Sequence, residues 1–218
     1  MNLDKLKTAE TAFLSAYPLG FDTPGLKEMV KKHDMSRITL FAQNAFSPTA
    51  LEDIEKATDD LVRLIARSSI VSVFEKAKLR DAVRSMSYGE REDMMGFVRE
   101  LLHGHEAMGF DGLCGMLFRY GASKWPLVTA LRCYYYPDTD LVIKPTTVKN
   151  VISHFGLIEL HYVTQPNFAF YNKYRSAVQS LRSHTAAPMN SYALAGYSGF
   201  LMMVLGLLPN LPPAPPQI

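Results

Sequence analysis

A short turn between two helical patterns carries residue types that bind phosphate. It reads Gly121-Ala122-Ser123-Lys124, follows one apolar helical pattern and precedes another that begins near Trp125. Backbone N–H groups in such a turn, together with those at the start of the next helix, form a site that suits an anion. We therefore interpret Gly121, Ser123 and Lys124 as candidate phosphate contacts.

Positive charge is concentrated in the same part of the chain. The formal net charge is only +2, but positions 119–182 hold eight Lys or Arg against three Asp or Glu, which is +5 there and −3 elsewhere. Lys144 and Lys149 belong to this surplus and join Lys124 as candidate nucleic-acid contacts. A surplus of this size suits phosphate or an acidic partner, and it is also typical of a solvated face.

Aromatic side chains lie among these cations. Rings beside cations suit unpaired bases and backbone phosphate, whereas rings at helical spacing are also typical of a buried core. Both interpretations stay open for Tyr120, Trp125, Tyr134, Tyr135, Tyr136, Phe168, Phe170, Tyr171 and Tyr174.

Two further groups could carry chemistry. His103, His105 and Glu106 have metal-binding side chains, and a site there would need Cys114 or Asp111 in addition. They surround Gly104, where a helix is expected to end, so a surface turn is the alternative. We predict no metal and no cofactor.

Cys114 and Cys133 are the only cysteines, and both lie in apolar helical patterns. A nucleophilic cysteine needs a base and a lowered thiol pKa, so small buried side chains are the simpler interpretation. Unpaired cysteines fit a reducing compartment, and the N-terminal residues lack the pattern of a signal peptide, so we expect a cytoplasmic location. The motifs of nucleotide hydrolysis and dinucleotide binding are absent from the sequence.

The elements that must position these residues read as helix after helix. Ser47-Pro48 predicts the start of a helix that runs to Arg67, and Ser87 with Glu90 has the spacing of a capping box that opens a helix ending at Gly104. Further helices are expected at residues 3–16, 24–33, 36–44, 71–86, 107–119, 124–135, 145–155, 167–182 and 190–205. The fold class is all-α, with one two-lobed helical domain over 1–208 and a Pro-rich tail at 209–218.

The last helical pattern raises the question of a membrane. Residues 192–208 are mainly apolar, but the run is at the short limit for a span and glycines dilute it. We expect a buried core helix, capped by Asn190 and closed by Gly206, rather than a membrane anchor.

The segment from 121 to 157 resembles the second half of the helix-hairpin-helix DNA glycosylase superfamily. Gly121 matches the first hairpin glycine, Pro137-Asp138 a break after the apolar helix, Val142-Ile143 an apolar pair, and Gly156-Leu157 a helix end. The resemblance covers about 40 of 218 residues. It implies a helical hairpin beside a cleft, and contact with DNA.

The same resemblance shows two departures from the family pattern. Ser123 replaces the second hairpin glycine, and Lys144 occupies the position of the catalytic aspartate. Lys124 lies one position away from the lysine with which some members attack the sugar. The resemblance therefore implies nucleic-acid binding without the usual base excision.

Three hypotheses for function remain open. The most specific is a nucleic-acid-binding helical protein that lacks base-excision chemistry. The second is a bacterial structural or protein-interaction module, a homo-oligomer included, without a catalytic site. The third is an enzyme acting on a small molecule or modified base in a cleft between the lobes, where Tyr136 and His154 would join Lys144.

Overall fold

A computed structural model describes residues 1–208, and every regular element in that part is helical. The all-α prediction is confirmed, because no residue of 1–208 lies in a strand. The α-helices are α1 (Leu3–Ala16), α2 (Pro24–Lys31), α3 (Met35–Ala45), α4 (Ile54–Arg67), α5 (Val73–Ser85), α6 (Tyr88–His103), α7 (Glu106–Arg119), α8 (Trp125–Tyr135), α9 (Pro145–His154), α10 (Phe168–Ser183) and α11 (Leu194–Leu207).

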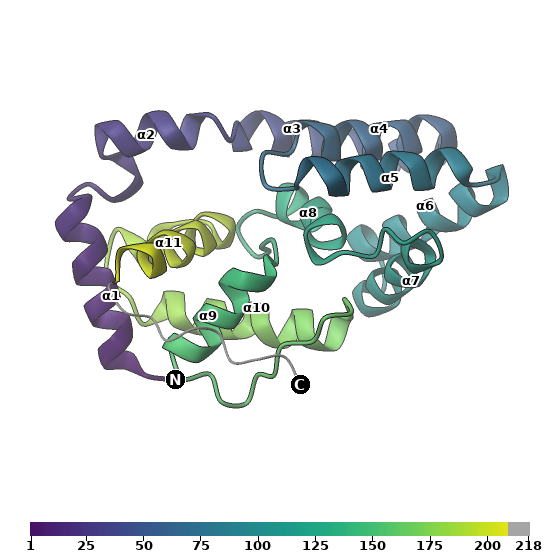
Figure 1. Cartoon of the computed structure of the whole chain (residues 1–218). Coiled ribbons are helices and arrows are strands. Elements are labelled where there is room, and N and C mark those ends of the chain that lie inside the picture. Colours follow the sequence, from purple (N-terminus) through teal and green to yellow (C-terminus); the bar gives the residue numbers. More distant parts are fainter. Residues whose placement is uncertain (209–218) are drawn as a thin grey trace.

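The helices pack in two groups (Figure 1). In the first, α4 packs against α3, α5 and α6, α6 packs against α7, and α8 contacts several of these helices. In the second, α11 packs against α1, α9 and α10. The first helix of the chain therefore joins the last three, and the backbone N–H of Asn2 donates to the carbonyl of Phe155 at 2.7 Å. Helix α2 runs between α1 and α3 along the top of Figure 1.

Side-chain caps explain where several helices begin. The hydroxyl of Ser87 accepts from the N–H of Glu90, whose carboxylate accepts from the N–H of Ser87, so the predicted capping box is confirmed. Ser72 and Glu75 make the same arrangement at α5. Gly104 follows the last residue of α6, as expected.

Two predicted helix starts are wrong. The helix expected from Ser47-Pro48 begins only at Ile54, after a short 3-10 turn, because the Asp53 carboxylate caps it by accepting from the N–H of Lys56 at 3.1 Å. Asn190 lies in another 3-10 turn and does not cap the last helix.

Helix α11 instead begins at Leu194 and includes Gly206. Its first N–H groups are satisfied by main-chain carbonyls, since Leu194 donates to Asp138 and Ala195 to Pro137. These acceptors come from a distant turn, which local sequence could not indicate.

Helix α11 belongs to the core, as predicted. Its buried residues are Leu194, Tyr197, Phe200, Leu201, Val204 and Leu205. Within residues 1–208, no helix has both the length and the apolar character needed to cross a bilayer. The Pro-rich tail predicted at 209–218 lies outside the described residues.

Most of the aromatic rings considered for base stacking are core instead. Trp125, Tyr134, Phe170, Tyr171 and Tyr174 are all buried. Phe110 stacks on Tyr171 with ring centroids 5.0 Å apart. The helical spacing of these residues therefore reflects packing between helices, and they offer no face to a ligand.

Candidate functional site

The turn from α7 to α8 closes one helix and opens the next. Gly121 has a left-handed φ of +65°. Its N–H donates to the carbonyl of Phe118 at 3.0 Å, and the N–H of Ala122 donates to the carbonyl of Leu117 at 2.9 Å. This pair of bonds is a Schellman motif, in which glycine avoids the strain of a left-handed residue. The N–H of Gly121 is thus used by α7, and the glycine acts by shaping the turn.

The start of α8 leaves its main-chain donors free. Lys124 occupies the N-cap position and its side chain makes no capping hydrogen bond. The N–H groups of Lys124, Trp125 and Leu127 have no acceptor among residues 1–208. The side chain of Ser123 turns inward, since Ser123 is buried and its Oγ accepts from Gln165 Nε2 at 3.4 Å.

Helix α9 repeats this arrangement. Lys144 is its N-cap residue, again without a side-chain cap, and Pro145 follows at the first helical position. In the described part of the chain, nothing accepts from the N–H groups of Thr146 and Thr147. Each helix start thus has main-chain donors without an acceptor among residues 1–208 beside an N-cap lysine, and at α8 the donors belong to the exposed Lys124 and to the buried Trp125 and Leu127.

One hydrogen bond joins the segment before α9 to the body of α8. The hydroxyl of Thr129, one turn into α8, accepts from the N–H of Ile143 at 3.1 Å, and Ile143 directly precedes Lys144. Thr129 in turn donates to the carbonyl of Trp125 at 2.6 Å. The segment that leads into α9 is therefore held against the first turns of α8.

Lys149 is linked to the same region through aromatic rings. Its Nζ lies 4.9 Å from the ring centroid of Tyr162. Tyr162 contacts Phe170, with centroids 5.9 Å apart, and Phe170 contacts Trp125 at 5.4 Å. The side chain of Lys149 is therefore held by its ring contact rather than by a carboxylate.

A buried carboxylate, Asp140, holds the segment that precedes Lys144. It is fully buried and accepts from Arg132 Nε at 2.8 Å, Arg175 Nη1 at 2.9 Å, Tyr171 Oη at 2.8 Å and Thr139 Oγ1 at 2.8 Å. Burial opposes the charged form, but these donors, Arg132 foremost, hold the pKa of Asp140 below its usual value. Its lone pairs are all engaged by these donors, so it is not available as a base or a nucleophile.

The same cluster accounts for part of the local positive surplus. Arg175 also binds Glu106, with Nη1 to Oε1 at 2.7 Å, so two arginines face two carboxylates. Five cations of this stretch form no ion pair among residues 1–208: Lys124, Lys144, Lys149, Lys173 and Arg182. Sequence analysis missed this cluster. The charged residue Asp140 at the start of the otherwise apolar run 140–143 could have indicated a buried carboxylate.

Of the proposed cleft residues, Lys144 and His154 lie at opposite ends of α9. The hydroxyl of Tyr136 donates to the carbonyl of Leu102 at 2.7 Å. His154 ends α9, where burial and Lys5 lower its pKa. Lys144 precedes the first residue of that ten-residue helix, so its backbone is about 15 Å from that of His154.

The metal and cysteine candidates also have structural roles. His103 Nε2 donates to the carbonyl of Phe46 at 2.8 Å, and residues 1–208 contain no group of three metal-binding side chains suited to hold an ion. Burial raises the pKa of both Cys114 and Cys133 to about 12, which keeps them as unreactive thiols.

Comparison of the chain with protein-family models, curated proteins and solved structures finds no match.

Proposed function

We propose that this protein binds the phosphate backbone of nucleic acid at the paired starts of α8 and α9, without excising bases. The observation that carries the proposal is that two successive helices, joined by the hydrogen bond from Ile143 to Thr129, each begin with an uncapped lysine, at Lys124 and Lys144. Lys149, on α9, is the third cation of the proposed site.

A lysine at the start of a helix is unfavourable without an anion. The helix dipole places partial positive charge there, and a cation in that position costs about 0.3–1 kcal/mol. Side chains cap the starts of α1, α4, α5, α6 and α10. Helices α2, α3, α7 and α11 lack side-chain caps as α8 and α9 do, but none of these four has a lysine at its N-cap position. A bound phosphate would satisfy the free N–H groups at α8 and α9 and neutralise the lysines at once.

Nucleic acid is the polyanion that we favour, for two reasons. Its phosphates recur at short intervals, so neighbouring groups of one strand can reach both helix starts. The resemblance of residues 121–157 to helix-hairpin-helix glycosylases points the same way. Base excision is not part of the proposal, because Lys144 occupies the position of the catalytic aspartate and Asp140 is fully engaged.

Fluorescence anisotropy tests the proposal with a labelled duplex and a labelled single strand at low ionic strength. We expect K124Q/K144Q/K149Q to bind much more weakly than wild type. The matched control is K32Q/K76Q/K78Q, which removes the same charge from lysines of the α2 and α5 region that form no ion pair within residues 1–208. If both variants lose the same affinity, the effect comes from net charge and not from this site. If wild type does not bind, the proposal is refuted.

A protein-interaction module remains a second candidate because of one exposed apolar pair. Val73 is 76% exposed and Phe74 is 84% exposed at the start of α5. Apolar neighbours this exposed are more typical of contact surfaces than of solvated helices. Light scattering over a concentration series tests self-association. This candidate function predicts that wild type self-associates and that V73S/F74S does not.

A further inference from the structure

A shallow depression lies on α7 beside the turn that leads into α8. It is lined by Asp111, Cys114, Gly115, Phe118, Gln165 and Pro166. Asp111, Gly115 and Phe118 are spaced by four and three residues, so they share one face of the helix. Gln165 Nε2 donates to Ser123 Oγ, which connects the depression to the residue just before Lys124.

The depression has an open aromatic wall. Phe118 is 63% exposed, unlike the buried rings of the core. A Cβ added at Gly115 would meet no atom within 4 Å, so the helix surface beside Phe118 is open. An exposed ring next to an open surface is what a planar base needs for stacking.

The polar atoms at the edge of the depression are hydrogen-bond acceptors. Asp111 Oδ1 accepts from the N–H of Phe168 at 2.7 Å, while Oδ2 has no hydrogen-bond donor among residues 1–208. Gln165 uses its amide nitrogen on Ser123, which leaves its amide oxygen as an acceptor. Acceptors at this edge pair with the amino groups of adenine, cytosine or guanine, whereas thymine has no amino group to offer.

We propose that this depression is a subsite for one unpaired nucleobase that carries an amino group. This inference rests on the proposed function, because the base would belong to a strand whose phosphate lies at the start of α8. The base stacks on Phe118 over Gly115 and directs its amino group to Asp111. Single strands, or ends and bulges with unpaired bases, are thus the preferred ligands.

Three variants separate the base subsite from the phosphate site. Gly115→Leu fills the depression, and its fold is supported by the open space at that position and by the higher helix propensity of leucine. Phe118→Ala removes the stacking face. Asp111→Asn keeps an acceptor for the N–H of Phe168 while turning the outer atom into a donor. Gly96→Leu, on α6 and equally open, is the matched control.

The experiment measures anisotropy of labelled oligo(dA), oligo(dT) and a blunt duplex hairpin. We expect wild type to prefer oligo(dA) to oligo(dT), and G115L and F118A to bind oligo(dA) about tenfold more weakly with little change for the duplex. D111N should no longer prefer oligo(dA) to oligo(dT). G96L should bind all three ligands with the affinity of wild type.

The outcomes distinguish the two claims. If wild type binds, K124Q/K144Q/K149Q weakens binding, and G115L and F118A bind oligo(dA) like wild type, the base subsite is refuted and the phosphate site stands. If wild type shows no salt-sensitive binding to any of the three ligands, both are refuted.

Discussion

Arg132 and Asp140 form a two-point ion pair inside the protein, with Nε to Oδ1 at 2.8 Å and Nη2 to Oδ2 at 3.1 Å. Arg132 belongs to α8, and Asp140 lies in the segment between α8 and α9. Arg175 of α10 binds the same carboxylate. The pair therefore fixes the path of the chain into Lys144 while it joins α8 to α10.

Removing this carboxylate charge should destabilise the whole fold. Asp140→Asn leaves the buried Arg132 and the partly buried Arg175 with Glu106 as their one carboxylate partner within residues 1–208, and loss of one partner from a buried pair costs about 3–5 kcal/mol. Urea unfolding measures the change. Asp138→Asn is the control, because Asp138 is exposed and should change stability by less than about 0.5 kcal/mol. A similar small effect at Asp140 would contradict its role.

Two glycines of α7 should respond in opposite ways to alanine. A Cβ at Gly109 would lie 2.1 Å from the backbone N of Leu101, so G109A forces α6 and α7 apart and should cost at least about 1–3 kcal/mol. G115A meets no atom and should stabilise the helix by up to about 1 kcal/mol. Thermal unfolding compares the two variants. Equal effects would contradict the close packing of α6 on α7.

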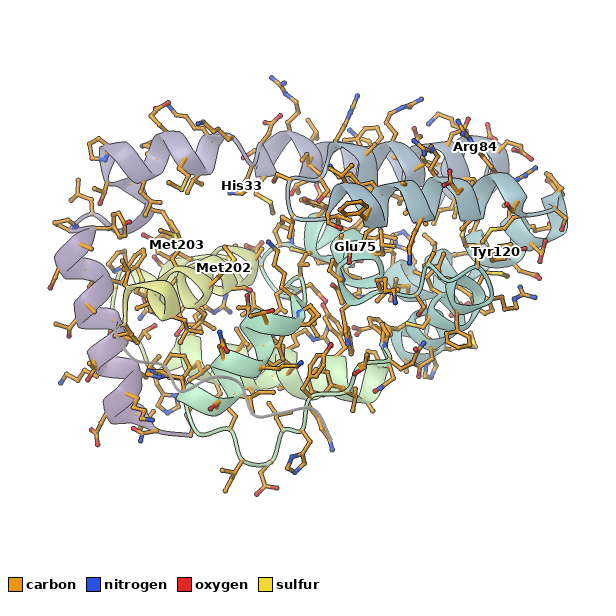
Figure 2. The ribbon with its side chains drawn as sticks, in the orientation of Figure 1. His33, Glu75, Arg84, Tyr120, Met202 and Met203 are labelled. Atoms are coloured by element: carbon orange, nitrogen blue, oxygen red, sulfur yellow. The ribbon has the colours of Figure 1, made fainter. Side chains whose placement is uncertain are left out.

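Stability below pH 5 should depend on the contact between Tyr120 and Glu90. Tyr120, labelled in Figure 2, lies where α7 ends, and its hydroxyl donates to Glu90 Oε1 at 2.6 Å. This bond, with the bonds from Ser87, lowers the pKa of Glu90 from 4.5 to about 2. A carboxyl whose folded pKa is lowered stabilises the protein above its unfolded pKa, and this contribution is lost as the pH falls from 4.5 to about 2.

Tyr120→Phe removes the largest cause of that shift. The Tm of wild type should exceed that of Y120F at pH 6, and the difference should shrink as the pH falls toward 2. Glu90→Gln provides the control, since on that background Y120F should show no such pH dependence. A difference that stays constant from pH 6 to pH 2 would show that the carboxylate is not involved.

Stability and binding should change in opposite directions at Lys144. Lys144→Asp places a good capping residue at the start of α9 and removes a cation from the positive end of the helix, so it should raise stability by about 1 kcal/mol. The same change should weaken nucleic-acid binding. Lys173→Asp, in the exposed interior of α10, is the matched charge change and should not stabilise the protein. Unchanged binding by K144D would exclude this lysine from the interface.

Local signals in the sequence predicted the helices well. Ser87 with Glu90 marked a true capping box, and the helix expected at 3–16 matches α1 to the residue. At both wrong starts another group satisfies the first N–H groups of the helix: the Asp53 carboxylate caps α4, and carbonyls of residues 137–138 accept from the start of α11.

The candidate site was predictable only in its backbone part. The Gly-Ala-Ser-Lys turn indicated a helix end followed by a helix start, because that geometry is local. The engagement of Asp140 by Arg132 and Arg175 depends on which helices meet, so spacing along the chain could not reveal it. For the same reason, sequence could not distinguish the exposed ring of Phe118 from the buried ring of Trp125.

The most direct test of the proposed phosphate site is the salt dependence of binding. For a protein that neutralises phosphates, the logarithm of the association constant falls linearly with the logarithm of the salt concentration, by about 0.9 per contact on duplex DNA. We predict that K124Q/K144Q/K149Q reduces the steepness of this slope by about 2–3 relative to wild type, while K32Q/K76Q/K78Q leaves it unchanged. Equal slopes for wild type and K124Q/K144Q/K149Q would contradict the assignment of phosphate binding to the starts of α8 and α9.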